Sequence, residues 1–448
     1  MNRIAIIGAG LAGLTAAYRL HKANLNVDVF EARDRVGGRV FTVLIENHFG
    51  KKTEVELGGQ NITDGGEAVN LLALVRELSL EVQENPIKLN LRVYFNGDYY
   101  DFDALVKNHN KTYKDLPLLA NSAENIGNLI DIFCGKNAIL KQALLTRITA
   151  YEGIDAYQQS IYHNIETLEY MLRGGLSKCH KLNTDNDNYI TTSSIAKENA
   201  RLPISIAEII KNNIHFNTVL SKVSFDSSAV KIEFTDQSCY SYDLVVLAIP
   251  ASTFKFIDFS NVGIGDRRLS DIHSIQYGKN FKIAMSLNLN AANSYRSVIT
   301  DSTISFFNHD KNIQLVYAYE PVLDASKFMN ITITGLNAIQ QEFSNEPSQV
   351  MQKHYSIYKE PIQYHWHNDL FSMGSYSGYS TAISKELDNI TQHNGTYYKT
   401  MFLPVQNSIF FVGEHTTILE CIGTVEAAVE SGKRIACAII RDVKKHLQ

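Results

Sequence analysis

The sequence contains little cysteine, and the cysteines follow no recognisable pattern. Five are scattered over 448 residues and form neither a Cys-x-x-Cys pair nor a Cys/His ligand set: Cys134, Cys179, Cys239, Cys421 and Cys437. An odd, unpatterned set argues against a disulfide framework and against structural zinc, and it indicates reduced thiols. We therefore expect a cytoplasmic protein that holds no structural metal.

Long apolar runs and a strong excess of one charge are also missing. No stretch of about 18–20 uncharged apolar residues occurs, so we expect no membrane-spanning helix. The first residues, MNRIAIIGAG, lack the features of a signal peptide. Charged residues make up 20% of the chain and the formal net charge is −5. This balance gives no electrostatic case for nucleic acid or anionic lipid as a partner.

The features that are present begin at residues 3–7 (RIAII), a β-branched run typical of a buried parallel strand. A Gly-x-Gly-x-x-Gly motif, a helix-like stretch and a second strand at 27–32 follow. Such glycines permit a tight turn and close approach to a pyrophosphate, which the helix N-terminus attracts. An acid after the second strand can accept hydrogen bonds from adenosine ribose. The unit predicts a dinucleotide site with Gly8, Gly10, Leu11, Ala12, Gly13, Glu31 and Ala32.

The residues that follow choose between NAD and FAD. Residues 31–39 (EARDRVGGR) and 56–60 (ELGGQ) resemble the flavin-containing amine oxidase family, which includes monoamine, polyamine and L-amino acid oxidases. Arginine can supply a forked, always-charged donor to a phosphate. We interpret Asp34 and Arg35 as a solvated charged turn. The resemblance implies FAD as cofactor, with contacts from Arg33, Gly38, Arg39, Gly58, Gly59 and Gln60.

The length exceeds what one hydrophobic core usually supports, so two domains are expected. The resemblance covers the whole chain and implies an α/β fold, in which a Rossmann-like FAD-binding domain is interleaved with an α+β substrate domain of mixed sheet and helices. The FAD-binding segments would be 1–66, 196–261 and 369–448, and the substrate domain 67–195 and 262–368. Within the latter, strands are predicted at 281–289 (FKIAMSLNL), 313–319 (IQLVYAY) and 329–336 (MNITITGL).

The resemblance also assigns chemical roles. Lys282 would reach flavin N5 through a water, where positive charge stabilises the reduction of O2. Tyr376 would form part of an aromatic wall beside the flavin, suited to an amine nitrogen and its alkyl groups. Val219, or alternatively Leu220, would contact adenine through its backbone. Further cofactor contacts are implied for Trp366, the sole tryptophan, and for Gly413, Glu414, Thr424 and Val425.

The last helix, from Val425, should be capped by Thr424 and should point its N-terminus at the flavin N1–C2=O edge. Small residues at 427, 428, 431 and 432 would let the isoalloxazine approach it. Farther along, Glu430 and Arg434 read as an exposed i,i+4 pair.

Several positions depart from the family pattern. Ser375 stands where monoamine oxidases carry the cysteine bonded to the flavin, so FAD should be noncovalent. Thr424 replaces their second cage aromatic, and no arginine follows Gly58–Gly59, where L-amino acid oxidases hold a carboxylate. The usual Gly-Gly before the mid-chain helix is Glu198–Asn199, which leaves the local backbone path open.

Taken together, the sequence predicts an FAD-dependent oxidase of amines. Hydride transfer from the amine α-carbon to flavin N5 would give an imine, then an aldehyde or ketone, and O2 would become H2O2. The expected partners are a small-molecule amine and O2, and neither nucleic acid nor membrane. Two alternatives stay open: a flavin desaturase or isomerase of an isoprenoid or tetrapyrrole, and a redox-silent FAD-bearing interaction protein. The sequence does not identify the amine or the oligomeric state, and a homodimer is one of the options.

Overall fold

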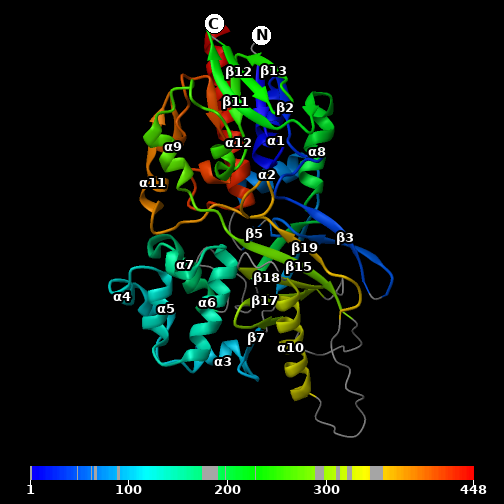
Figure 1. Cartoon of the computed structure of the whole chain (residues 1–448), viewed down its shortest axis with the longest axis vertical. Coiled ribbons are helices and arrows are strands. Elements are labelled where there is room, and N and C mark those ends of the chain that lie inside the picture. The colour runs from blue at the N-terminus through cyan, green and yellow to red at the C-terminus, as the bar shows by residue number, and fades with distance from the viewer. Residues whose placement is uncertain are drawn as a thin grey trace.

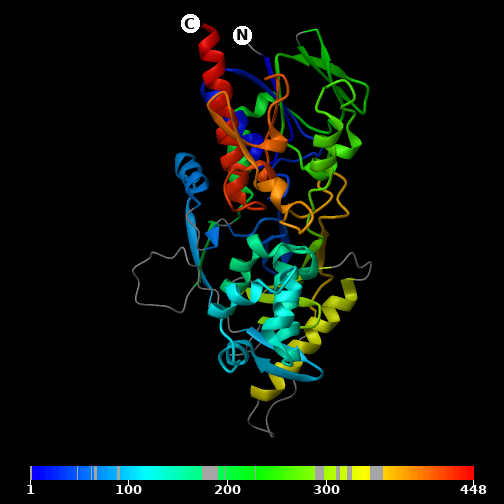
Figure 2. The ribbon, with the colours of Figure 1, turned by 90° about the vertical axis from the view of Figure 1, so that its left-hand side faces the viewer.

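The computed structural model describes residues 3–47, 49–61, 63–64, 68–87, 91–173, 190–196, 198–227, 229–287, 297–308, 313–319, 325–343 and 357–447. The molecule is elongated, and both termini lie at the same end (Figure 1). The chain passes between the upper and the lower part more than once, so that blue, green and red segments share the upper part (Figures 1 and 2).

A parallel sheet forms the centre of the upper part. Its order within the described residues is β10 (Ile214–His215), β2 (Asn26–Phe30), β1 (Arg3–Ile7), β14 (Leu244–Leu247) and β22 (Ile409–Phe411). Three distant parts of the chain therefore contribute to one sheet. Their near-continuous apolar character agrees with burial on both faces. On one face pack α1 (Leu11–Lys22), α8 (Arg201–Ile210) and α12 (Val425–Leu447).

Smaller elements complete the upper part. An antiparallel sheet of β11 (Leu220–Asp226), β12 (Ala229–Phe234) and β13 (Cys239–Tyr242) packs into a second core with the 3₁₀ turn Ala251–Phe256 and α9 (Asp266–His273). The upper part also contains β20 (Ile390–His393), β21 (Thr396–Lys399), α2 (Val69–Glu77) and α11 (Ser384–Asp388). The hairpin of β3 (Thr42–Glu46) and β4 (Lys52–Glu56) instead packs against the sheet of the lower part.

The lower part is built on a mixed sheet. Its order within the described residues is β19 (Ile362–His365), β15 (Asn280–Ser286), β18 (Ile313–Tyr319), β17 (Thr303–Asn308), β16 (Ser297–Ile299), β7 (Leu91–Phe95) and β8 (Asp98–Asp101). One face packs on α3 (Phe102–Lys107), α4 (Leu116–Ala120), α5 (Ile126–Cys134), α6 (Ala138–Glu152) and α7 (Ile161–Leu172), and the other on α10 (Ala325–Phe343). A further sheet joins β5 (Thr63–Asp64), β9 (Ile190–Ile195) and β6 (Val82–Ile87).

One predicted strand is wrong. Residues 329–336 (MNITITGL) lie inside helix α10. The β-branched alternation suggested a strand, but Phe328, Thr332 and Leu336 recur at every fourth residue and are all buried. Their spacing matches one face of a helix packed on the sheet. The other two predicted strands are β15 and β18, although residues 288–289 lie outside the described residues.

The prediction of an exposed Glu430–Arg434 pair is also wrong, and that of a solvated turn holds for Asp34, which is exposed, but not for Arg35. Glu430 is buried and the side chain of Arg434 is only 11% exposed. Their ion pair of 2.6 Å is joined by hydrogen bonds to Thr417 and Thr416 in the loop before α12. Arg35 lies over the ring of Phe41, with 4.1 Å from Cζ to the ring centroid, and burial lowers the pKa of its guanidinium. These side chains hold loops in place.

The small residues of α12 chiefly meet helix α1. A Cβ at Gly432 would overlap the carbonyl oxygen of Ala12 and crowd Thr15, so glycine is required there. Ser431 accepts the N–H of Gly413 at 3.0 Å. The expectation that a flavin ring approaches this whole face therefore needs correction, because only the first turn and Ala428 border the cavity described below.

The domain boundaries remain predictions, and the one expected between residues 66 and 67 lies outside the described residues. The four cysteines within the described ranges are free, while Cys179 lies outside them. Among the described helices, none combines the length and apolar character that a membrane span requires.

Candidate functional site

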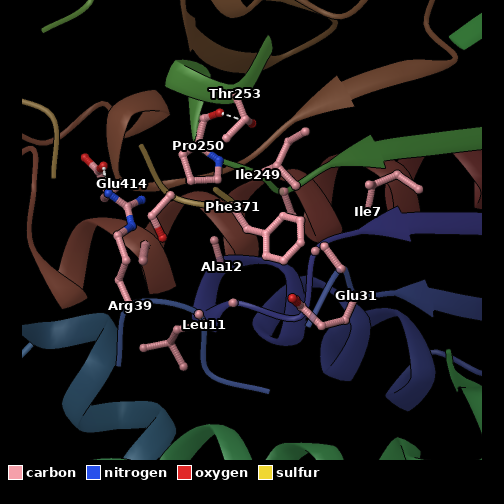
Figure 3. Close-up of a pocket in the computed structure, with 18 of the residues that line it drawn as sticks. Ile7, Leu11, Ala12, Glu31, Arg39, Ile249, Pro250, Thr253, Phe371 and Glu414 are labelled. Atoms are coloured by element: carbon pink, nitrogen blue, oxygen red, sulfur yellow. Dashed lines mark hydrogen bonds and ion pairs between the residues drawn. The ribbon is translucent and has the colours of Figure 1, made fainter. Parts of the chain in front are cut away.

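A cavity of about 360 Å³ lies between the N-termini of α1 and α12. Figure 3 shows Leu11 and Ala12 on one side of it and Ile249 and Pro250 on the other. In the same view, Glu31 lies at one end, whereas Arg39 and Glu414 lie at the other (Figure 3). The cavity is thus elongated, with one helix N-terminus near each acidic group.

The α1 end of the cavity is built from backbone. Gly10 precedes the helix without a side-chain cap, and the first turn holds no acidic residue, so its N–H groups remain available to an anion. Gly8 has a φ of +108°, and a Cβ there would crowd Ala248. A Cβ on Gly38 would lie 3.2 Å from the Cα of Gly10. Both positions therefore need glycine for close packing around the turn.

Glu31 is nearly fully buried beside this turn. Its carboxylate accepts the N–H groups of Ala9 at 2.7 Å and Arg33 at 2.9 Å. The two bonds use different oxygens of the carboxylate, and each oxygen has a second lone pair. Glu31 can therefore orient the turn and still accept a hydroxyl group from a ligand.

Arg33 borders the cavity but is already paired. It forms an ion pair with Asp369 and donates to Ser372 Oγ at 2.9 Å. Tyr364 donates to the second oxygen of Asp369 at 2.6 Å. These bonds hold residues 370–372 against the cavity. The structure thus gives Arg33 a role in anchoring a segment, since Asp369 compensates its charge.

Glu414 connects three parts of the chain at the other end. It accepts from Arg39 Nη1 at 2.9 Å, from the N–H and Oγ of Ser377, and from the N–H of Gly423 at 3.0 Å. Burial, the largest single influence, opposes the charge, but Arg39, His415 and the hydrogen bonds from Ser377 together hold the pKa of this carboxyl below its ordinary value. The carboxylate is therefore charged at neutral pH.

The N-terminus of α12 also borders the cavity. Thr424 Oγ1 accepts the N–H of Ala427 at 3.1 Å, so Thr424 caps the helix as expected. The preceding Gly423 has a φ of +78° and packs against Tyr376. Thr424, Val425 and Ala428 line the cavity. A second set of free helical N–H groups therefore lies at the end opposite Glu31.

Tyr376 lines the same end of the cavity. Its hydroxyl donates to the carbonyl of Tyr151 and accepts from Asn280 Nδ2 at 3.0 Å, which fixes the ring. The adjacent Ser375 also lines the cavity, and its buried Oγ has no hydrogen-bond partner among the described residues.

Lys282 lies behind the cavity wall. Its ammonium donates to the carbonyl of Gly58 at 2.6 Å and lies 4.9 Å from the ring centroid of Tyr317. Lys279, which lies just before strand β15, is exposed. Gly59, which follows the bonded carbonyl, does line the cavity. One layer of backbone therefore separates the lysine from the cavity.

The predicted site residues fall into two groups. Those lining the cavity are Gly8, Gly10, Leu11, Ala12, Glu31, Ala32, Arg33, Gly38, Arg39, Gly59, Val219, Tyr376, Gly413, Glu414, Thr424 and Val425. Leu220, the alternative to Val219, lines it too. Those that are not part of its wall are Gly13, Gly58, Gln60, Trp366 and Lys282. Trp366 donates its indole N–H to the carbonyl of Leu57 at 2.9 Å.

The prediction missed other residues of the wall. The segment after β14, which includes Ile249, Pro250, Thr253 and Phe256, contributes to the cavity together with Phe371. Apolar residues in a turn carry no sequence signal of ligand contact.

His415 is a further residue to which no role was assigned. It is 1% exposed, lines the cavity, and neither ring nitrogen has a hydrogen-bond partner among the described residues. Burial lowers the pKa of its imidazole to about 4, so the ring is neutral at pH 7. A neutral ring can offer one donor and one acceptor to a bound molecule.

These features fit FAD. The glycine turn and uncapped α1 N-terminus suit a pyrophosphate, Glu31 suits a ribose, and the α12 N-terminus suits an electron-rich ring edge. Ser375 and His415 supply unpartnered buried polar atoms at the wall. Among the described residues, no cluster of three or more His, Cys, Asp or Glu side chains could hold a metal ion.

Comparisons with known proteins agree with this interpretation. The family model described as flavin containing amine oxidoreductase matches residues 11–293 and 332–440. Lysine-specific histone demethylase 1 homologs 3 and 2 of Arabidopsis thaliana are 25% and 26% identical over 98% of this chain. The matches cover only 30% and 58% of those relatives. Amine oxidase [flavin-containing] A of Sus scrofa is 39% identical, but over 23% of this chain and 18% of its own.

The fold is similar to that of solved oxidases. Wild-type putrescine oxidase bound to putrescine superposes with a TM-score of 0.69 and 18% identity, covering 98% of this chain and 99% of that chain. Cyclohexylamine oxidase from Brevibacterium oxydans superposes with a TM-score of 0.67 and 15% identity, covering 99% of each. At these identities the similarity establishes the fold alone.

Proposed function

Since this chain belongs to the flavin-containing amine oxidoreductase family, with FAD as its cofactor, we propose that it is an oxidase of amines. The amine and O2 give an imine and H2O2, and water then converts the imine to an aldehyde or ketone with release of ammonia or a smaller amine. When bound, FAD would accept two electrons from the amine and would pass them on to O2.

The observation that carries the proposal is the placement of Lys282. Its ammonium rests on the carbonyl of Gly58, next to the cavity-lining Gly59. A fixed positive charge at this depth favours the anion that forms when O2 is reduced. An isomerase, or a desaturase that passes its electrons to an acceptor other than O2, has no such need, so this feature favours an oxidase.

Tyr376 and Thr424 shape the region where the amine would bind. The Tyr376 ring is fixed by bonds at its hydroxyl and lines the cavity. Thr424 is small, and its hydroxyl is occupied by capping α12. We therefore expect one aromatic wall, and an amine that is held through its alkyl groups on that side.

The N-terminus of α12 has an electrostatic role in this proposal. Its free N–H groups and positive dipole end favour negative charge at the adjacent end of the cavity. Arg39 is paired with Glu414 and contributes little net charge there. The helix would thus stabilise the reduced state of the site.

A peroxide-coupled screen of mono-, di- and polyamines, amino acids and a histone-derived lysine peptide tests the proposal. We expect peroxide with at least one amine, and loss of the yellow colour with the same amine when air is excluded. Bleaching by an amine without peroxide would show that an acceptor other than O2 takes the electrons, and would contradict an oxidase. No bleaching by any compound would support the redox-silent alternative.

A further inference from the structure

Side chains from distant elements bind the carbonyl groups of residues 57–60. The carbonyl of Leu57 accepts from Trp366 Nε1 at 2.9 Å, and that of Gly58 accepts from Lys282 Nζ at 2.6 Å. The N–H groups of residues 57–59 bond to the backbone of residues 39–41. Both the carbonyl groups and the N–H groups of this segment are therefore hydrogen-bonded to other parts of the protein.

The next two carbonyls are bound by one residue, Asn199. Its Nδ2 donates to the carbonyls of Gly59 at 3.0 Å and Gln60 at 2.6 Å. Its Oδ1 accepts the N–H of Ile195 at 2.9 Å, and its own N–H donates to Glu56 Oε1 at 2.8 Å. At 3% exposure, Asn199 uses both amide donors and its acceptor inside the protein.

Asn199 lies between β9 and α8, at a position where the sequence resemblance implies glycine. Glycine could not supply the two donors, and aspartate would place an oxygen against two carbonyl oxygens. The sequence left the backbone path at Glu198–Asn199 open, and the structure shows that a side chain fixes it.

The bound segment connects the cavity to Lys282. A Cβ on Gly59 would lie 3.2 Å from Val425 Cγ2, so Gly59 fits closely against the first turn of α12. Gln60 Oε1 accepts from the hydroxyl of Tyr317 and lies 3.5 Å from Lys282 Nζ. A shift at residues 59–60 would therefore change both the cavity wall and the surroundings of the lysine.

We propose that Asn199 is a positioning residue for the flavin. It fixes Gly59 against the bound cofactor and, through Gln60, keeps Lys282 directed at the cavity wall. The inference depends on FAD binding and not on the identity of the substrate.

The test compares Asn199→Asp with Asn213→Asp. Asn213 makes the same kind of bond, from Nδ2 to the carbonyl of Val27 at 2.7 Å, on strand β2 away from Gly59. Three quantities are measured without any amine: the FAD dissociation constant, the visible flavin spectrum, and the rate at which chemically reduced enzyme is reoxidised by O2.

For Asn199→Asp we expect an FAD dissociation constant raised about tenfold or more, a shifted flavin band and reoxidation slowed about tenfold. Asn213→Asp should match the wild type in all three. If Asn199→Asp does not fold, Asn199→Gly, which introduces no repulsion, should show the same changes at smaller size. A folded Asn199 variant with unchanged affinity and spectrum would overturn the proposal. Weakened FAD with an unchanged reoxidation rate would overturn the link to Lys282.

Discussion

At the scale of single residues, the site depends on buried polar groups that bind other parts of the protein. Glu414 joins Arg39, Ser377 and Gly423, which come from three separate regions. Sequence motifs identified Glu414 and Arg39, but not that each would be the other's partner. A motif describes residues that are neighbours in the sequence. Arg39 and Glu414 are 375 residues apart, so their ion pair depends on the complete fold.

Glu414→Gln keeps the shape of this side chain and removes its charge, which leaves Arg39 without its partner. Breaking a buried ion pair costs about 3–5 kcal/mol, so we expect a loss of unfolding free energy near the lower value, measured by urea titration. Glu233→Gln, in the more exposed pair with Lys231, should cost less than about 1 kcal/mol. Equal losses in the two variants would contradict this account of Glu414.

His415 should make the fold sensitive to acid. Its pKa is about 4 in the folded protein and near 6.5 when unfolded, so on acidification the unfolded state takes up the proton first. Stability from this group is complete above about pH 6.5 and falls by up to about 3 kcal/mol as the pH drops to about 4. His415→Phe, compared with wild type by urea titration across this range, should lose that part of the acid dependence. Parallel pH profiles would contradict the prediction.

Lys282→Met tests the proposed role in oxygen reduction. We expect reoxidation of the reduced enzyme by O2 to slow by about 100-fold, because a preorganised charge near the reacting group is lost. Stopped-flow measurement of that rate is the check. Lys279→Met, at the exposed lysine just before the same strand, should have no effect. A similar rate in both variants would remove Lys282 from the mechanism.

At the scale of elements, α1 and α12 together create the site. They pack so closely that Gly432 contacts the backbone of Ala12, and both helix N-termini reach the cavity. The sequence predicted both helices, the cap at Thr424 and the small residues of α12. It did not predict what those residues contact, because close approach to a helix and close approach to a ligand select the same side chains. The strand predicted at 329–336 failed because its β-branched residues masked the four-residue spacing of Phe328, Thr332 and Leu336, which form the buried face of a helix.

Gly432→Ala tests this packing. Helix propensity alone would stabilise the variant by about 1 kcal/mol, but the added Cβ overlaps the carbonyl of Ala12. We expect a net loss of about 1–3 kcal/mol in unfolding free energy, with weaker FAD binding as α1 shifts. Cys437→Ala, at an exposed position on the same helix, should change stability by less than about 0.5 kcal/mol. A stabilised Gly432→Ala would show that the helices can separate freely.

At the scale of the whole molecule, the helices of the lower part dock on the segment that carries Tyr376. The carbonyl of Tyr379 accepts from the N–H of Ser160 at 3.0 Å and from Asn164 Nδ2 at 3.1 Å. His163 stacks on the ring of Tyr379 and bonds Asp388 at 2.6 Å. The sequence indicated an interleaved chain through its family resemblance, but these contacts have no local signature. They hold the aromatic wall in a fixed place relative to the flavin-binding turn.

The central claim is that two helix N-termini from opposite ends of the chain hold one FAD without a covalent bond. The most direct test is the visible spectrum of supernatant and pellet after acid precipitation of the purified protein. We predict about one equivalent of FAD per chain in the supernatant and a colourless pellet, because Ser375 offers no thiol to the flavin. Colour retained in the pellet, or protein that carries and takes up no flavin, would contradict the account.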